Sequence, residues 1–444
     1  MKRRRLYLSL LVLLALLTAL AGCASAGENE AALISADNVS GDLIYSIYAG
    51  NTVTITGYTG SERVLALPDK IDTRPVTAIA ADAFANCTGI VHLSIGKSVK
   101  TIGDGAFYGC AGLVELEIGG KITSIGADAF GACTSLNSVV IGDKVTSLGN
   151  SAFAGCIGLT EVELGAGLRA LPNSCFAGCE SLLTVKLGKN IAEIGEEAFY
   201  QCESLLHFDF GKSVERIGAR AFSYCTALLD AELGGKIASV GEEAFFRCTA
   251  MERLVLGDKL RELGDGVFYA CQALTDVTIP AKLTTIGYSV FEETPWLDAQ
   301  TDEFVIIGDG ILLRYNGRGG EVRVPDTVKV IADAFGGCTT LTAVTVPDKV
   351  TAIGAYAFYD CPSLSAVTLG DKVSSIGYAA FSGCALLTQV RLPSSLTVIE
   401  NNAFGGCAAL AMVSYPGSEK KFGEIAIGSG NDALTGAVIS YKTS

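Results

Sequence analysis

The sequence predicts a β-rich solenoid of about 14 units of 23 residues, and three observations lead to that prediction. A cysteine follows almost every recurring phenylalanine after three residues, and short apolar runs alternate with turn residues. No apolar period near 3.6 lasts long enough for a full helix. The third observation is the fixed spacing of the phenylalanines themselves, which are Phe84, Phe107, Phe130, Phe153, Phe176, Phe199, Phe222, Phe245, Phe268 and Phe291, then Phe335, Phe358, Phe381 and Phe404.

The unit from Cys133 to Gly155 shows why each repeat should form one turn of chain. Alternation at period two in its first half turns Leu136, Val139 and Ile141 inward and leaves Val140 outward, as expected of a short strand. We expect the second half to complete the lining through a tight turn or a single helical turn, with Val145, Leu148, Ala152, Phe153 and Cys156 pointing inward. One such turn cannot bury its apolar face alone, so neighbouring turns must stack around a continuous core.

The chain has fifteen cysteines, and most of them occupy the same position of their own unit. A cysteine that recurs at one fixed position of successive units is expected to act as a small buried hydrophobic residue and to stack on the equivalent cysteines of the neighbouring units. Thr294 fills this position in the tenth unit, and Cys175 takes a position elsewhere held by alanine. We therefore predict buried free thiols, with disulfides between turns and a metal site at Cys175 and Cys179 as the less favoured alternatives.

Residues 1–22 have the pattern of a bacterial export signal, with a basic start, an apolar run and small residues before Cys23. The tetrapeptide that ends at Cys23 resembles a lipobox, which implies a lipoprotein signal peptide and a lipidated Cys23 as the first mature residue. The protein would then be held on a membrane by its acyl chains. The alternative is an uncleaved anchor, but residues 6–21 are short for a membrane span of about 20 residues.

The segments that follow are expected to form a tether and a cap. Residues 23–42 lack either apolar period and predict a lipidated, flexible tether. Residues 43–75 predict an N-terminal β cap, because residues 43–48 and 52–58 alternate around Gly50 and Asn51 as in a hairpin. A cap is needed there to shield the first turn of the solenoid from water.

The repeats should occupy residues 76–294 and 326–415, with a C-terminal cap over 416–444. Residues 295–325 interrupt the period and predict an irregular repeat that carries a protruding hairpin. This interval holds the single tryptophan, Trp296, which is a candidate binding element. The other interpretation is that Trp296 fills the core where regular stacking lapses.

The spacing in LVELEIGGKITSIGADAFGAC, residues 113–133, and in its copies resembles the BspA-like (Treponema-type) leucine-rich repeats of bacterial surface lipoproteins. The resemblance extends over roughly residues 43–441. It implies a right-handed, curved leucine-rich repeat superhelix, classed as α/β in that family. It also implies adhesion or ligand binding at the outer side of the cell membrane, with an extracellular protein or polysaccharide as the partner.

The chain has 33 basic and 47 acidic residues and a formal charge of −14, which argues against nucleic acid as a partner. Repeat phase gathers acidic side chains on the solvent face of the first strand of each unit, which we expect to be the concave face. The candidate binding face comprises Glu115, Glu117, Glu161, Glu163, His207, Asp209, Asp230, Glu232 and Asp276. This face is either a contact surface for a basic or polar partner or simply a solvated acidic surface.

Nothing in the repeats predicts an enzyme, a cofactor or a metal. The two histidines, His92 and His207, lie five units apart, which is about 24 Å along the axis. No Ser or Cys has a plausible base within reach for nucleophilic catalysis. Side-by-side carboxylates on an open sheet lack the enclosure that separates pKa values, and no calcium-loop pattern is present. We therefore expect a non-enzymatic binding or adhesion protein, with a structural spacer or envelope scaffold as the alternative.

Overall fold

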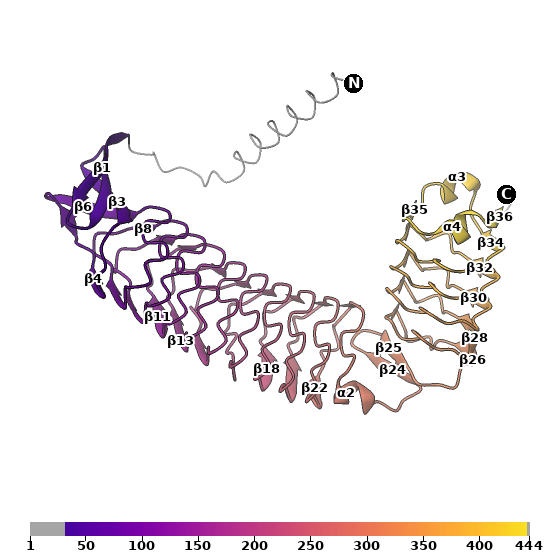
Figure 1. The fold of residues 1–444 in the computed structure, drawn as a ribbon. Coiled ribbons are helices and arrows are strands. Elements are labelled where there is room, and N and C mark those ends of the chain that lie inside the picture. The colour runs from indigo at the N-terminus through magenta and orange to yellow at the C-terminus, as the bar shows by residue number, and fades with distance from the viewer. Residues whose placement is uncertain (1–31, 442–444) are drawn as a thin grey trace, which may run out of the picture.

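The computed structural model describes residues 32–441, which form a β-solenoid of about 17 turns (Figure 1). The repeat architecture is thereby confirmed. The number of turns exceeds 14 because segments without the repeat motif, in the caps and at residues 295–325, also form turns of the stack. The signal peptide, Cys23 and residues 23–31 of the expected tether lie outside the described residues.

Each repeat except the one that contains Phe208 contributes a first strand of three to five residues, and these strands stack in parallel with a register offset of one unit. Val139, for example, pairs with Val162 of the next turn. Along the first part of the chain they are β4 (Val64–Ala66), β7 (His92–Ser94), β9 (Glu115–Glu117), β11 (Ser138–Ile141), β13 (Glu161–Leu164), β15 (Thr184–Lys186), β18 (Asp230–Leu233), β20 (Arg253–Leu256) and β22 (Asp276–Thr278). Beyond the interruption they are β26 (Gly320–Arg323), β28 (Leu341–Thr345), β30 (Ala366–Thr368), β32 (Gln389–Arg391), β34 (Met412–Tyr415) and β36 (Val438–Tyr441).

A second, mostly two-residue strand follows in each repeat and stacks in the same way. In the first part these strands are β6 (Arg74–Ile79), β8 (Thr101–Ile102), β10 (Ser124–Ile125), β12 (Ser147–Leu148), β14 (Ala170–Leu171), β16 (Glu193–Ile194), β17 (Arg216–Ile217), β19 (Ser239–Val240), β21 (Glu262–Leu263) and β23 (Thr285–Ile286). In the second part they are β27 (Val330–Ile331), β29 (Ala352–Ile353), β31 (Ser375–Ile376), β33 (Val398–Ile399) and β35 (Ala426–Ile427).

The segment around each phenylalanine is a succession of turns and contains no helical turn. Two residues per unit adopt left-handed backbone there, as Asp128 and Ala132 do with φ of 52° and 55°. The turns are joined by backbone hydrogen bonds, such as the 2.8 Å bond from the Phe130 N–H to the Ala152 carbonyl. Successive phenylalanine rings stack in the core, with Phe107 and Phe130 5.1 Å apart and 3° from parallel.

The fourteen described cysteines are all free thiols, and all but Cys87 and Cys338 are buried. The prediction of buried free thiols is confirmed for these residues. Each buried thiol in the repeat position also donates a hydrogen bond to a phenylalanine carbonyl in the preceding turns, as Cys110 does to Phe84 at 3.2 Å. The tenth unit differs because Thr294 caps helix α2 (Pro295–Asp298), its hydroxyl accepting from the Leu297 N–H.

The N-terminal cap is a three-stranded antiparallel arrangement of β1 (Leu33–Ser40), β2 (Leu43–Tyr48) and β3 (Thr52–Tyr58). The expected hairpin is present, and β3 continues in parallel into β6, with β5 (Lys70–Ile71) beside β6. The tether predicted over 23–42 is wrong for residues 33–40, which form β1. The reason is that β1 pairs with the free edge of β2, a contact that its own weak apolar pattern did not reveal.

The hairpin in the interruption consists of β24 (Phe304–Ile307) and β25 (Ile311–Tyr315), and it is embedded in the stack, so the expectation that it protrudes is wrong. Strand β25 pairs in parallel with β27 and is buried on both faces. Its residues Ile311 and Leu313 belong to one hydrophobic core, and Leu312 belongs to the other. This strand therefore forms the partition between two cores, which explains its uninterrupted apolar sequence.

The interruption divides the solenoid into two arms, residues 43–294 and 316–441, which meet at an elbow formed by residues 295–315 (Figure 1). The three- to five-residue strands run along the outer edge of the bend and are called the outer column. The short second strands run along the inner edge and are called the inner column. The expected concave position of the acidic face is wrong, because that face belongs to the outer column.

The C-terminal cap covers the last turn with two short helices, α3 (Glu419–Phe422) and α4 (Asp432–Thr435). Their buried residues Phe422 and Leu434, together with Ile425, close the second core against water. Apart from α2, α3 and α4, each of four residues, the described chain is strand and turn.

Candidate binding surfaces

The acidic residues predicted as a binding face are exposed on the outer column, but most of them are paired with a side chain of the neighbouring turn. Four of these pairs are ionic or involve a histidine: His92 with Glu115 at 2.9 Å, Lys186 with Glu163 at 2.5 Å, His207 with Asp230 at 2.7 Å and Arg253 with Asp276 at 3.7 Å. Ser94 also donates to Glu117 at 2.9 Å. Lys186 and Arg253 are the fixed cations in these pairs, so the negative charge of this face is only partly compensated within it.

Three of the predicted residues make no such cross-turn pair. Glu161 and Glu232 have no ion pair among residues 32–441, and Asp209 accepts a hydrogen bond from the Gly211 N–H at 2.8 Å. His207, Asp209, Asp230 and Glu232 border a hollow of about 410 Å³, whose floor is Phe208 and Phe210. These two rings pack edge-on against the phenylalanine stack and displace the regular strand of this unit.

Trp296 lies at the elbow, where it is half-buried against the core. Its ring is 4.8 Å from that of Phe291, the last phenylalanine of the first arm, at a tilt of 55°. The backbone N–H of Trp296 donates to the Leu274 carbonyl at 2.8 Å, which attaches α2 to the ninth unit. The indole therefore covers the end of the phenylalanine stack.

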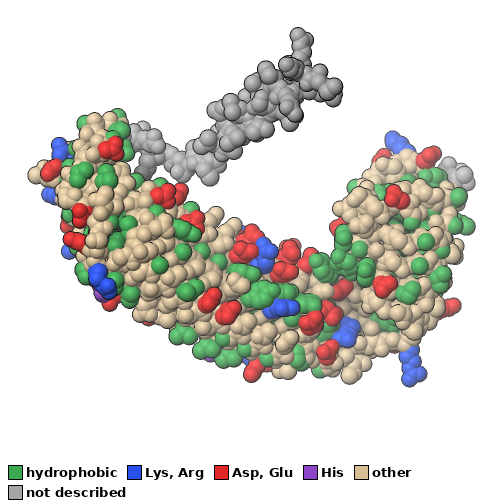
Figure 2. Space-filling view, viewed as in Figure 1, with side chains coloured by type: hydrophobic (Ala, Val, Ile, Leu, Met, Phe, Trp, Pro, Cys, Tyr) green, Lys and Arg blue, Asp and Glu red, His purple; other side chains and the backbone are tan. Residues whose placement is uncertain are grey.

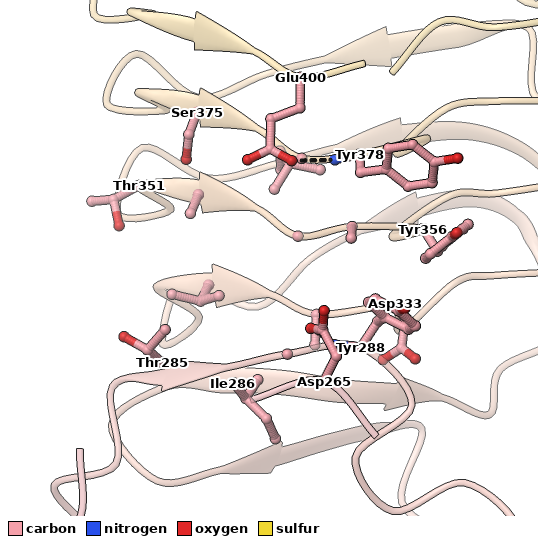
Figure 3. A pocket seen from close by; sticks show the side chains of 18 of the residues that line it. Asp265, Thr285, Ile286, Tyr288, Asp333, Thr351, Tyr356, Ser375, Tyr378 and Glu400 are labelled. Atoms are coloured by element: carbon pink, nitrogen blue, oxygen red, sulfur yellow. Dashed lines mark hydrogen bonds between the residues drawn. The ribbon is translucent and has the colours of Figure 1, made fainter. Parts of the chain in front are cut away.

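A hollow of about 820 Å³ lies on the inner side of the elbow (Figure 3). Residues that directly follow inner-column strands of both arms line it. The first arm supplies Asp265 and Tyr288, and the second supplies Asp333, Tyr356, Tyr378 and Glu400. Figure 2 shows hydrophobic side chains gathered at this inner side of the bend.

Three of the lining tyrosines form a continuous aromatic cluster across the elbow. Tyr356 lies between Tyr288 of the first arm, at 4.9 Å, and Tyr378 of its own arm, at 5.3 Å. Both contacts are edge-to-face, a favourable geometry for aromatic pairs. Tyr378 is 39% exposed, so the outer ring of the cluster is accessible to a ligand.

The carboxylates of the cavity hold the backbone that carries these tyrosines. Asp265 accepts from the Tyr288 N–H at 3.2 Å, and Glu400 accepts from the Tyr378 N–H at 2.9 Å (Figure 3). Burial raises the pKa of Asp265, and the nearby negative charges of Glu242 and Glu400 raise it further. Burial also raises the pKa of Asp333, to about 6.

This cavity is not among the sites predicted from the sequence, although the residues at two positions of the repeat indicate it. Two and three positions before the repeat phenylalanine, tyrosine occurs only at Tyr288, in the last unit before the interruption, and at Tyr356 and Tyr378, in the second and third units after it. Elsewhere these positions hold Ala, Gly, Ser, Asn, Asp, Glu or Arg. A comparison of these two positions across the units would have marked the elbow as a local aromatic surface.

The described residues contain neither a group of metal ligands nor a membrane-spanning helix. Within residues 32–441, no three His, Cys, Asp or Glu side chains are arranged to hold a metal ion. None of the helices in that range is long and apolar enough to span a bilayer. What the elbow provides is a concave surface of aromatic rings and carboxylates, a combination suited to binding.

A scan against protein families matches the BspA type leucine-rich repeat region, with six copies over residues 77–206, 192–301 and 315–430. The chain belongs to this family. Its repeat architecture, and the resemblance stated from residues 113–133, are thereby confirmed. The matched ranges do not include the N-terminal segment before residue 77 or the second half of the C-terminal cap after residue 430.

Solved structures of bacterial leucine-rich repeat proteins are similar to this BspA-type chain. A leucine rich cell surface protein from Faecalibacterium prausnitzii is 25% identical, with 88% of this chain and 98% of that chain covered and a TM-score of 0.42. A leucine-rich repeat protein from Bacteroides ovatus is also 25% identical, with 91% and 99% covered and a TM-score of 0.48. A search of curated proteins found no match.

Proposed function

We propose that this BspA-type protein is a lipid-anchored surface protein of a bacterium that binds a macromolecular partner, either a protein or a glycan. Family membership supports the binding role, because stacked repeats provide extended surfaces for recognition. The similar chain from Faecalibacterium prausnitzii is described as a cell surface protein. The lipobox-like sequence before Cys23 supports the anchor.

The observation that carries this proposal is the cavity at the elbow. It is the place where regular stacking is interrupted, and it combines carboxylates with tyrosine rings, whereas the positions of these tyrosines hold no aromatic residue in the other units. Clustered exposed tyrosine is a feature of recognition surfaces, because the ring supplies contact area and its hydroxyl supplies a hydrogen bond.

Two experiments test the proposal. Mass spectrometry of the protein from membranes should find Cys23 as an acylated N-terminal residue, and Cys23→Ala should release the protein from the membrane fraction. The ectodomain that begins at residue 24 should bind at least one member of a panel of matrix proteins and glycans. An ectodomain that is folded by circular dichroism but binds no member of the panel would contradict the binding role.

The second candidate function is a spacer or envelope scaffold without a specific ligand. The pairing of acidic side chains along the outer column favours it for that face, since a carboxylate that is already bound by a neighbouring side chain is less available to a partner. Charge reversal at Glu115, Glu161, Asp230 and Asp276 distinguishes a spacer from a protein that binds through the outer column, and the binding panel above tests for binding at any other surface. A spacer is indifferent to these changes, whereas a protein that binds through the outer column loses its partner.

A further inference from the structure

The elbow cavity differs from the outer column in its charge balance. Its lining contains the carboxylates of Asp265, Asp333 and Glu400, and none of its lining residues is Lys or Arg. The carboxylates come from both arms, Asp265 from the first and the other two from the second. The fold thus brings like charges together on the concave side of a bend, where the surrounding walls strengthen their field.

A second hollow, of about 450 Å³, adjoins the first and shares Tyr288, Asp333 and Tyr356 with it. It adds two more carboxylates, Glu292 and Glu293, and again its lining residues include no Lys or Arg. The shared tyrosines therefore form a wall with carboxylates on both sides. An extended ligand that crosses this wall would meet carboxylates on both sides, with the positive charge of Arg314 near Glu292.

The carboxylates retain the capacity to accept further hydrogen bonds. Asp265 and Glu400 each accept one backbone N–H, from Tyr288 and Tyr378, while an ionised carboxylate has about four acceptor positions. The backbone bonds fix the direction of the carboxylates without neutralising them. The site is therefore preorganised, and its charge is available to a ligand.

The tyrosine rings add a second attraction with the same preference. The face of a tyrosine ring carries partial negative charge and attracts a cation placed within about 6 Å of its centre. In this cluster each contact directs the edge of one ring at a face of the next, and Tyr378 at the end of the cluster is 39% exposed, so part of its ring is accessible to a cation. Exposed aromatic faces beside unpaired carboxylates are the groups that bind ammonium and guanidinium ions.

We propose that the elbow binds a cationic segment of a partner protein, with a lysine or arginine side chain seated against Tyr356 and Tyr378 and between the carboxylates of Asp265 and Glu400. This inference deepens the proposed function, on which it rests, by assigning the site and the chemistry of the partner. Lysine is a suitable occupant because its methylene stem packs on tyrosine while its ammonium group reaches the carboxylates. Arginine adds a planar fork that matches a carboxylate.

The probe for the test is an N-acetylated hexalysine peptide titrated into the ectodomain, residues 24–444, by isothermal calorimetry at 50 mM and 150 mM salt. The double variant Asp265→Asn with Glu400→Gln keeps the oxygen atoms that accept the backbone bonds and removes both charges. We expect it to weaken hexalysine binding by about tenfold or more. Tyr378→Leu, at the exposed rim, should weaken binding by about threefold, and Tyr378→Phe should restore it.

The matched control is Glu115→Gln with Glu161→Gln on the outer column, which removes the same charge from a different face. It should change the affinity by less than about twofold. Equal losses in the two double variants would show attraction to overall charge and would overturn the elbow assignment. Melting curves establish that each variant is folded before binding is measured.

Maltohexaose and chitohexaose, titrated in the same way, separate this inference from the proposed function. Tyr378-dependent binding of either sugar, without binding of hexalysine, would overturn the cationic partner and leave the surface binding function intact. Failure of both probes at millimolar concentration would also overturn this site. Capture of a matrix protein or glycan by an ectodomain with the Asp265 and Glu400 changes would place recognition elsewhere.

Discussion

Asp333 of the second arm accepts a hydrogen bond from the backbone N–H of Ser289 of the first arm, with 2.6 Å between the nitrogen and Oδ2. The two residues are 44 positions apart because the interrupting segment lies between them. In regular turns the N–H at the position of Ser289 donates instead to a backbone carbonyl of the next turn, as the Asp128 N–H does to the Asn150 carbonyl at 2.9 Å. The Asp333 carboxylate therefore takes, across the elbow, the place of the backbone carbonyl that accepts this bond in regular turns.

Burial of Asp333 predicts a pH-dependent effect of its charge on stability. Its pKa is raised from 3.8 to about 6, so ionisation disfavours the folded state. The contribution of the carboxyl is favourable below about pH 4 and is lost as pH rises through about 6. Asp333→Asn, which keeps an acceptor for Ser289, should raise the free energy of unfolding by about 1 to 2 kcal/mol at pH 7 and give no advantage at pH 4.

Thermal unfolding followed by circular dichroism from pH 4 to pH 8 checks this expectation. Asp326→Asn, at an exposed position of the same arm, serves as the control and should change stability by less than about 0.5 kcal/mol. A constant difference between Asp333→Asn and the native protein over the whole pH range would contradict the assigned role of ionisation.

The cysteines should divide sharply in their reactivity toward thiol reagents. Cys87 and Cys338 are partly exposed, and the other described cysteines are buried. In the ectodomain from residue 24, an excess of 5,5′-dithiobis(2-nitrobenzoic acid) should rapidly modify about two thiols and reach the remainder only in denaturant. Cys87→Ala with Cys338→Ala should remove the rapid phase. Rapid modification of most thiols in the folded protein would contradict the buried ladder.

Alkaline pH should destabilise the protein through the same thiols. Burial raises the pKa of Cys110, Cys271 and Cys407 to about 12, against 9.0 for an unperturbed thiol. Because the folded pKa is the higher one, their contribution is complete below pH 9 and is lost as pH rises toward 12. Each such thiol should lower the free energy of unfolding by up to about 1.4 kcal/mol per pH unit in that range.

Urea titrations at pH 7, 9 and 10 measure this slope, and Cys110→Ala provides the comparison. The variant should be less stable than the native protein at neutral pH. Above pH 9 its free energy of unfolding should fall more slowly with pH than that of the native protein. Identical slopes above pH 9 in the two proteins would rule out a contribution from Cys110.

The phenylalanine stack should contribute strongly to stability. Phe153 is fully buried between Phe130, at 5.3 Å, and Phe176, at 5.6 Å. Phe153→Ala should destabilise the protein by about 3 to 5 kcal/mol, because it leaves a cavity inside a continuous stack. Val140→Ala, on the exposed side of β11, should cost less than about 0.5 kcal/mol. Urea midpoints compare the two variants, and similar midpoints would contradict the stack as the main core.

Repetition made the fold predictable from the sequence. Val139 and Val140 illustrate this, since alternation alone placed the first in the core and the second on the surface, where they are 1% and 59% exposed. The same phase argument identified the buried cysteines. Their hydrogen bonds to phenylalanine carbonyls were not foreseen, because they depend on how successive turns are offset.

The parts that escaped prediction depend on contacts between segments without the repeat. Strand β1 acquires its conformation from the edge of β2, and the hairpin β24–β25 is embedded because β27 pairs with it. The side of the bend on which Glu115 lies follows from the curvature of the whole solenoid, which no single unit encodes. The elbow cavity required both this curvature and the tyrosines that flank the interruption.

The position of β25 between two cores affects how this protein would respond to mechanical tension along its axis. In the described chain the strand ladders of the first arm end at β22 and β23, and new ladders begin at β24 and β26. Tension between a tethered N-terminus and a ligand at the far arm would therefore be borne at the elbow by few main-chain bonds, such as that from Asp309 to Leu283. The bend would act as a compliant joint that straightens under load before either arm unravels.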